Sequence, residues 1–195
     1  MKYGQLSLDE VEAVLNNVGG MDAVNRLLSG LTSISMVWKT WKTIQLGYGQ
    51  KTVSDLADAI KQAGMGIGEF GDTLPDASNF SISTENVEVD LVIVSVGELG
   101  LEKGAIQKDV FARAQKLGLD ICPSEVGFRL RLQYDNQPEG EWIAIAMEPI
   151  YWAKFFSVFY LSTQGARKIR WLVAEVGGPD KFWNADSRLV FMRRK

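Results

Sequence analysis

Apolar residues in the first part of the chain recur at the three- and four-residue spacing of amphipathic helices. Ser7 and Glu10 fit a capping box, in which a serine oxygen accepts from a free helix N–H group and a glutamate reaches back. The pattern after them predicts a helix that ends at Gly19–Gly20, because glycine readily adopts the left-handed conformation of a helix cap. A second short helix is predicted over 22–30, so that residues 1–32 form a helical hairpin.

Two further helices are predicted, one over 52–64 with Thr52 as its N-cap and one over 105–117. A glycine ends each of them. The segments 46–67 and 99–121, which contain these helices, share the order Leu-Gly, helix, glycine and isoleucine. This order fits a duplicated strand–helix unit; it also fits two unrelated capped helices, which is the simpler interpretation.

The rest of the chain carries the β-branched and aromatic residues that are typical of strands. The strongest strand is predicted at 87–96, whose unbroken apolar run 91–94 is typical of burial on both faces. Further strands are expected within 33–47 and at 128–134, 141–149, 155–161, 168–176 and 188–193. Their short connections favour antiparallel pairing.

Helices early and strands late indicate the α+β class. We therefore predict an N-terminal helical hairpin (1–32) and an α+β domain (33–195). In this domain, strand–helix units precede a C-terminal antiparallel sheet of about five strands. The glycine-rich loop 64–80 is a candidate internal boundary.

The segment 128–149 is predicted to form a β-hairpin. Pairing Tyr134 with Glu141 places apolar residues opposite each other at every second position. The resulting pairs are Leu132–Ile143, Leu130–Ile145 and Phe128–Met147. A shift of one residue would mix apolar and polar side chains on each face, so this register is favoured.

The other face of this hairpin would carry long polar side chains beside small alanines. We predict a ligand-binding surface there, because neighbouring arginines bind carboxylates or phosphates and an indole stacks on rings. The predicted ligand-binding residues are Arg129, Arg131, Gln133, Trp142 and Glu148. One alternative is a solvated face with a cross-strand Arg129–Glu148 ion pair. Another is coverage by the early helices, in which case acidic residues would have to pair with buried arginines.

Composition narrows the classes of function. The chain has 195 residues, of which 46% are hydrophobic, and this is enough for a globular core. The formal charge of −3 gives no general attraction to nucleic acid or anionic lipid. No apolar run approaches the roughly 18 residues of a membrane-spanning helix, and we expect no signal peptide. The single cysteine excludes an internal disulfide, which fits the reducing cytoplasm.

The absence of histidine removes several catalytic chemistries. Ser–His–Asp and Cys–His mechanisms are excluded, as are the usual zinc and non-haem iron sites. Cys122 has no histidine to activate it, and we predict that it is a small buried hydrophobic residue. The glycine-rich stretch 64–72 lacks the ending of a phosphate-binding loop, and 135–141 lacks the order of a calcium loop. We therefore predict no cofactor and no metal site.

The stretches 41–47 and 122–150, which read "WKTIQLG" and "CPSEVGFRLRLQYDNQPEGEWIAIAMEPI", resemble a set of uncharacterised bacterial proteins. The shared features are a W-K-T-I-x-L-G stretch and a C-P-x-E-V-G…L-R-L-x-Y…Q-P-x-G-E-W segment. The resemblance implies a bacterial origin and a shared domain, and it carries no activity with it.

From these features we expect a cytoplasmic, non-enzymatic binding or protein-interaction module that uses the polar face of the 128–149 hairpin. The expected partner is a protein or an anionic small molecule, and neither a membrane nor a nucleic acid. The aromatic stretch 151–156 is a second candidate contact surface, because it combines tyrosine, tryptophan and phenylalanine. The alternative function is a histidine-free hydrolase with paired carboxylates, for example one that acts on a carbohydrate. The ligand and the oligomeric state stay open.

Overall fold

The computed structural model describes residues 7–17, 20–29, 38–68, 80–152, 155–165 and 168–194, with the backbone alone for 27, 28 and 152. The chain divides into two compact units, Met1–Val37 and Trp38–Lys195. In the described part of the chain, no helix has both the length and the apolar character needed to cross a membrane.

The first unit contains two helices, α1 (Leu8–Asn17) and α2 (Gly20–Leu28). The predicted capping box at the start of α1 is confirmed: the Glu10 N–H donates to Ser7 Oγ over 3.3 Å, and the Ser7 N–H donates to Glu10 Oε2 over 2.8 Å. The hydrogen bonds from the N–H and the hydroxyl of Ser7 lower the pKa of Glu10. Residues 18 and 19 lie outside the described residues, so the predicted glycine stop is described only at Gly20, whose φ is +80°.

The second unit has the α+β composition that was predicted. Its elements, in chain order, are β1 (Lys42–Leu46), α3 (Val53–Gln62), β2 (Gly66–Ile67), β3 (Val87–Ser95), β4 (Ala105–Ile106), α4 (Gln107–Lys116), β5 (Leu119–Asp120), α5 (Glu125–Gln133), β6 (Trp142–Ile145), β7 (Ile150–Trp152), β8 (Phe155–Gln164), β9 (Ile169–Val176), β10 (Phe182–Trp183) and β11 (Arg188–Arg193). The predicted strands that correspond to β3, β8, β9 and β11 are confirmed, and so are the helices α3 and α4. Thr52 caps α3 as predicted, with its side chain accepting from the Asp55 N–H.

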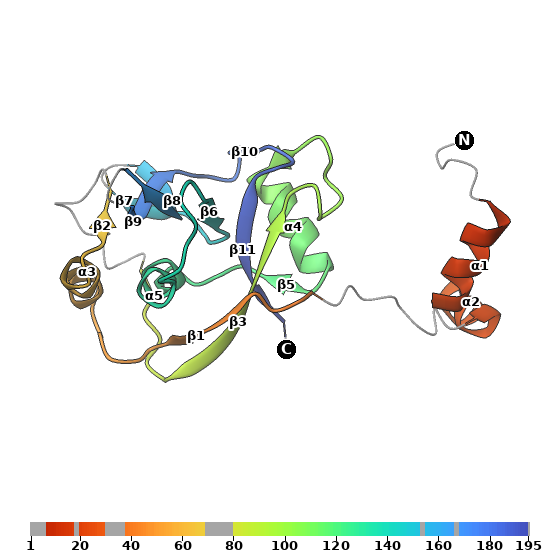
Figure 1. Ribbon diagram of the computed structural model, residues 1–195, viewed down its shortest axis with the longest axis horizontal. Helices are drawn as coiled ribbons and strands as arrows, with labels where there is room; N and C mark the ends of the chain where they lie inside the picture. The colour runs from red at the N-terminus through yellow and green to blue at the C-terminus, as the bar shows by residue number, and fades with distance from the viewer. Residues whose placement is uncertain are drawn as a thin grey trace. The chain divides into compact units, whose positions relative to one another are not determined.

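Among the described residues, nine strands form one mixed sheet with the central order β1-β3-β11-β6-β8-β9-β2 (Figure 1). The expected C-terminal antiparallel sheet is therefore wrong. Strand β11 runs parallel to β6, with Leu189 opposite Ala144, and β2 runs parallel to β9. Short connections make neighbours in the sequence antiparallel, as β8 and β9 are, but they do not decide which distant strand is the next neighbour.

The predicted strand 128–134 is also wrong, and with it the hairpin 128–149. Residues Glu125–Gln133 form the helix α5, and every residue from Glu125 to Arg131 is buried. A helix that is buried on all sides has no apolar stripe with a period of 3.6 residues. The alternation of leucine and arginine then imitates the period of a strand.

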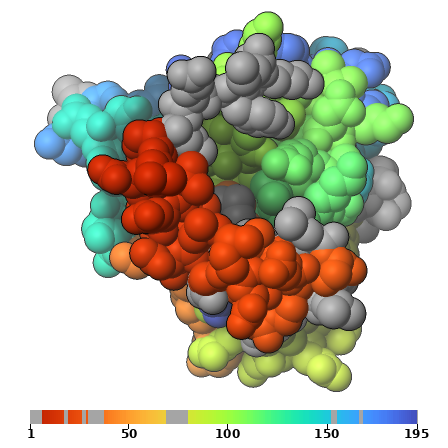
Figure 2. Space-filling model, turned by 90° about the vertical axis from the view of Figure 1, so that its right-hand side faces the viewer, coloured from red at the N-terminus to blue at the C-terminus, as the bar shows by residue number. Residues whose placement is uncertain are grey.

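Two helices illustrate how the core is packed. On α5, Phe128 contacts Phe159 of β8 edge-to-face with 5.3 Å between ring centroids, and α3 lies beside α5 (Figure 1). On α4, Phe111 contacts Phe191 of β11 at 6.1 Å, while the solvent side of α4 forms part of the surface in Figure 2 (green). Because side chains alternate along a strand, Tyr160 and Ser162 of β8 point away from the face on which Phe159 meets α5.

Candidate functional site

The face of β6, β8 and β9 that points away from α5 carries large aromatic side chains. Strand pairing sets Trp142 beside Ser162 and Ser162 beside Trp171. One step along, Ala144 pairs with Tyr160, and Tyr160 pairs with Val173. Because cross-strand partners share a face, both rows line the same side of the sheet.

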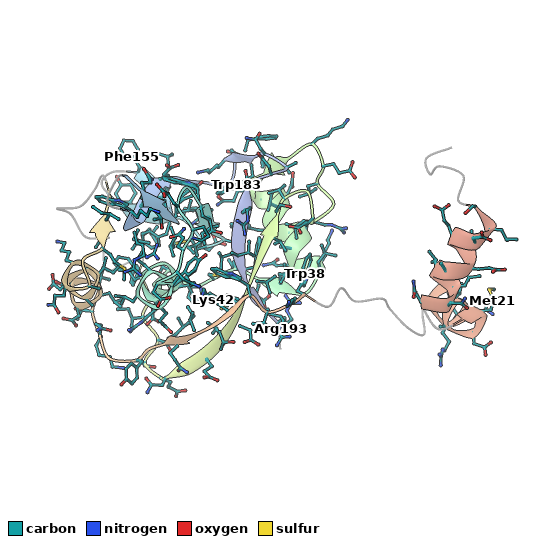
Figure 3. All side chains as sticks on the ribbon, viewed as in Figure 1. Met21, Trp38, Lys42, Phe155, Trp183 and Arg193 are labelled. Carbon is teal, nitrogen blue, oxygen red and sulfur yellow. The ribbon has the colours of Figure 1, made fainter. Side chains whose placement is uncertain are left out.

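Trp183 of β10, which is labelled in Figure 3, completes this aromatic group through its contact with Tyr160. Its ring stacks on Tyr160 with 6.0 Å between centroids and an interplanar angle of 29°. Trp142 lies at 5.7 Å from Tyr160. Tyr160 and Trp183 are buried, whereas Trp142 is 39% exposed, so the first two form a floor and Trp142 offers an accessible ring.

Lys181 places its ammonium group over this floor. The Lys181 Nζ lies 4.9 Å from the Tyr160 ring centroid and 4.6 Å from that of Trp183. It also donates to the Tyr160 hydroxyl over 2.7 Å and to the Val176 carbonyl over 3.0 Å. Burial lowers the pKa of Lys181, against the opposing effect of the Glu175 charge. Burial, together with the charge of Glu175, raises the pKa of Tyr160.

These side chains border an open hollow with a volume of about 460 Å³, which we call the aromatic hollow. Its lining residues are Trp142, Tyr160, Glu175, Lys181, Phe182, Trp183, Asn184, Asp186, Ser187 and Arg188. A second hollow of about 310 Å³ shares Trp142 and Glu175 with it and extends to Trp171 and Gly68. Trp142 therefore stands between two neighbouring hollows on one sheet face.

The charges around the aromatic hollow are unevenly paired. Arg188 forms an ion pair with Glu141 at 3.0 Å. Glu175 and Asp186 are exposed and have no hydrogen-bond or ion-pair partner in the part of the chain that the structure describes. The hollow thus combines aromatic rings with two carboxylates that are available to a ligand.

The structure separates the five residues that were predicted to bind a ligand. Of these, Trp142 lines the aromatic hollow. Glu148 is exposed and borders a different hollow of about 320 Å³ beside α4. Gln133 pairs with the backbone of Gln45, accepting from its N–H and donating to its carbonyl, each over 3.0 Å. No single surface of the described residues therefore contains the predicted set.

Both arginines of the predicted set are buried and have partners within the protein. Arg129 Nε donates to Glu125 Oε1 over 2.7 Å, and its other nitrogens donate to Tyr48 and Gln50. Arg131 donates to the Tyr134 carbonyl and to Gln137. Burial lowers the pKa of Arg131 to about 10. An acidic partner for a buried arginine was one of the sequence alternatives; Arg129 has one, and it comes from the same helix.

Sequence reasoning missed Tyr160, Lys181 and Trp183. Tyr160 lies in a strand that was predicted, but its face depends on which strands flank β8. Lys181 and Trp183 belong to a Gly-, Pro- and Asp-rich stretch, "GGPDKFWNADS", that was predicted to be a loop. Two large aromatic residues within such a loop are the signal that was available.

The aromatic stretch 151–156, the second candidate contact surface, is exposed where its side chains are described, at Tyr151, Phe155 and Phe156. Residues 153–154 lie outside the described residues, and the role of the stretch as a contact surface stays a prediction. Cys122 is buried as predicted, and burial raises the pKa of its thiol. Within the described ranges, no three acidic or cysteine side chains are grouped so as to hold a metal ion.

Comparison with known proteins does not identify the chain: no protein-family model, curated protein or solved structure matches it significantly.

Replacing Gly66 by alanine tests the packing behind the second hollow. A Cβ atom on Gly66 would lie 2.2 Å from Trp171 Cε3, so the indole would have to move. We expect the free energy of unfolding to fall by about 1–3 kcal/mol in chemical denaturation. Gly178→Ala is the matched control, because nothing lies within 4 Å of its added Cβ, and we expect a change of at most about 1 kcal/mol. Equal losses in the two variants would contradict this packing.

Proposed function

We propose that this protein is a non-enzymatic binding module that holds its ligand in the aromatic hollow. The observation that carries this proposal is the exposed ring of Trp142 beside the buried Tyr160–Trp183 stack, at the border of a 460 Å³ hollow. Binding sites typically combine a concave apolar surface with a few polar groups that orient the ligand. Here Glu175 and Asp186 are those groups.

The geometry favours binding over hydrolysis. A pair of carboxylates does border the hollow, as the hydrolase alternative requires. A general acid, however, must keep its proton near neutral pH, and enzymes achieve this by placing the carboxyl group in an apolar environment. Glu175 and Asp186 are both exposed, which favours ligand contacts over acid catalysis. A reducing cytoplasm is our proposed location, supported by the lone buried thiol of Cys122.

Nuclear magnetic resonance on the ¹⁵N-labelled full chain tests this proposal. The probes are benzoate, methyl β-glucoside and tetramethylammonium, one each from the anionic, neutral and cationic classes. We expect at least one of them to shift the indole signals of Trp142 and Trp183 in a saturable manner at millimolar concentration. In the Trp142→Ala variant, the Trp183 indole signal is expected to lose this response, because the accessible ring is removed.

Phe155→Ala is the matched control, because Phe155 is a half-exposed aromatic residue of β8 that does not line the hollow (Figure 3). It is expected to bind as the unchanged chain does. The proposal fails if none of the three probes shifts these signals, or if the Trp183 signal of Trp142→Ala responds as it does in the unchanged chain. Conversion of the glucoside to free glucose, detected by mass spectrometry, would favour the hydrolase instead.

A further inference from the structure

We infer that the ligand of the aromatic hollow is an organic ammonium ion, and that Lys181 occupies part of this cation site when no ligand is bound. The inference rests on the proposed binding function and names the chemical class of its ligand. It has three independent supports in the structure: the position of Lys181, the accessible rings beside it, and the charge balance of the lining.

The first support is that the aromatic floor already holds a cation. The Lys181 ammonium lies 4.6 Å from the Trp183 ring centroid, and it meets Tyr160 at the hydroxyl group over 2.7 Å. At such distances the negative face of an aromatic ring attracts a cation. The Lys181 N–H donates to the Gly178 carbonyl over 3.0 Å, which fixes the backbone turn from which this side chain extends.

The second support is that further aromatic surface remains accessible. Phe182 is 57% exposed and Trp142 is 39% exposed, and both border the same hollow. Among the described residues, Lys181 makes cation–ring contacts with Tyr160 and Trp183, and none with Phe182 or Trp142. A ligand cation can therefore stack on them first and then reach the floor as the lysine withdraws.

The third support is the charge balance. The lining carries two carboxylates, Glu175 and Asp186, and two cations, Lys181 and Arg188. Arg188 is paired with Glu141, which lies outside the lining, so two carboxylates remain beside the single cation of Lys181. Such a balance favours a cationic ligand and disfavours the anionic ligand expected from the sequence.

Lys181 is also an imperfect occupant of its position. A primary ammonium has three N–H donors, and two of them are used by Tyr160 and Val176. Burial lowers the pKa of Lys181, so its charged form is disfavoured. A quaternary ammonium has no N–H groups to satisfy and keeps its charge at every pH, so it loses less on entering an aromatic site.

The deciding experiment compares choline with its neutral isostere, 3,3-dimethylbutan-1-ol, on the full-length unchanged chain. In the alcohol a carbon atom replaces the positively charged nitrogen of choline, so the two molecules have the same shape and different charges. We expect choline to bind at the aromatic hollow about tenfold more tightly than the alcohol, measured from the Trp142 and Trp183 indole shifts. Equal affinity overturns the cation assignment and leaves the proposed binding function intact. Failure of every probe, including benzoate and the glucoside, overturns the binding function itself.

Two variants test the roles of the charged residues. Lys181→Met removes the internal cation, and we expect choline affinity to rise about fivefold. A ligand that needs Lys181 as a donor, such as a saccharide or an anion, would lose affinity instead, which would overturn the inference. Glu175→Gln with Asp186→Asn is expected to weaken choline binding about tenfold and to leave the alcohol unaffected. Unchanged choline binding in this variant would overturn the role of the carboxylates.

A final comparison identifies the source of the ammonium group. A short peptide with a central trimethyl-lysine presents the same cation as choline, with peptide backbone on both sides. Tighter binding of this peptide, with signal shifts that extend to Trp171, would indicate a partner protein. Equal or weaker binding would indicate a free small molecule. Both results require the same cation chemistry and support the inference. If the unmethylated and the trimethylated peptides both bound and the lysine position contributed nothing to binding, the inference would be overturned.

Discussion

Replacing Arg129 by methionine is expected to lower the free energy of unfolding by about 3–5 kcal/mol, measured by chemical denaturation. Arg129 and Glu125 are both buried and form an ion pair at 2.7 Å within α5. Glu125 also accepts from the Gly47 N–H over 2.9 Å and from the Ser83 N–H over 2.8 Å. The substitution leaves a buried carboxylate without its cation, and it leaves the carbonyls of Tyr48 and Gln50 without their donor. Loss of one partner of a buried ion pair is among the most destabilising single changes in proteins.

The matched control is Glu139→Gln, which breaks an ion pair of similar length at the surface. Lys168 and Glu139 lie 3.0 Å apart with more than half of each side chain exposed, and such pairs contribute about 0–1 kcal/mol. Adding Glu125→Gln to Arg129→Met is expected to recover part of the stability, because it removes the unpaired buried charge. If Arg129→Met and Glu139→Gln had the same small effect, the ion pair within α5 would have no structural role.

Replacing Phe159 by alanine is expected to lower the free energy of unfolding by a similar amount, about 3–5 kcal/mol. The Phe159 ring is fully buried and contacts Phe128 at 5.3 Å and Phe80 at 6.4 Å. The alanine leaves a cavity between β8 and α5 that neighbouring groups fill only in part. Phe155→Ala is the control on the same strand: Phe155 is half exposed, and we expect a loss below about 1 kcal/mol.

A second substitution tests which contact is responsible. A Cβ atom on Gly127 would lie 2.6 Å from Phe159 Cδ2. Helix propensity alone predicts that Gly127→Ala stabilises α5 by about 1 kcal/mol. The crowding predicts a loss of about 1–3 kcal/mol instead. In the Phe159→Ala background most of this loss is expected to disappear, because the ring is gone and only the contact with the Cβ of residue 159, at 3.0 Å, remains. Additive effects of the two substitutions would show that Gly127 and Phe159 do not pack against each other.

The segment 125–133 shows where sequence reasoning reached its limit. Its alternating apolar residues gave a consistent register for a hairpin, and the structure has a helix there. The spacing of apolar residues shows which side of a helix or strand faces water, and almost no side of α5 faces water. The i, i+4 spacing of Glu125 and Arg129 is visible in the sequence. The contribution of this ion pair to stability, however, depends on its burial, which one sequence does not reveal.

The similar segments 46–67 and 99–121 also show that a local sequence pattern does not decide which strands pair. Both contain a helix, then a glycine with positive φ (Gly64 at +72° and Gly118 at +82°), then a two-residue strand. Strand β2 pairs in parallel with β9, whereas β5 pairs antiparallel with β11. The local pattern therefore recurs, while the surroundings of the two short strands differ.

The candidate site was also predicted only in part from the sequence. Trp142 was predicted as a ligand-binding residue on a polar sheet face, and it does lie on an open face of a sheet. Its neighbours there are Tyr160, Lys181 and Trp183, in place of the arginines. The arginines support the fold from inside, because a helix in place of a strand turned them towards Tyr48, Gln50 and Gln137.

The sequence by itself determined the features that depend on residues within about four positions of each other. These are the capping box at Ser7, the N-cap at Thr52, the glycine after α3 and the strongly β-forming runs. Only the tertiary structure decided the state of α5, the mixed order of the sheet and the membership of the aromatic hollow. The physical reason is that each of these depends on pairing between segments far apart in the chain, and that pairing settles which side chains lose water and which ones a ligand can still reach.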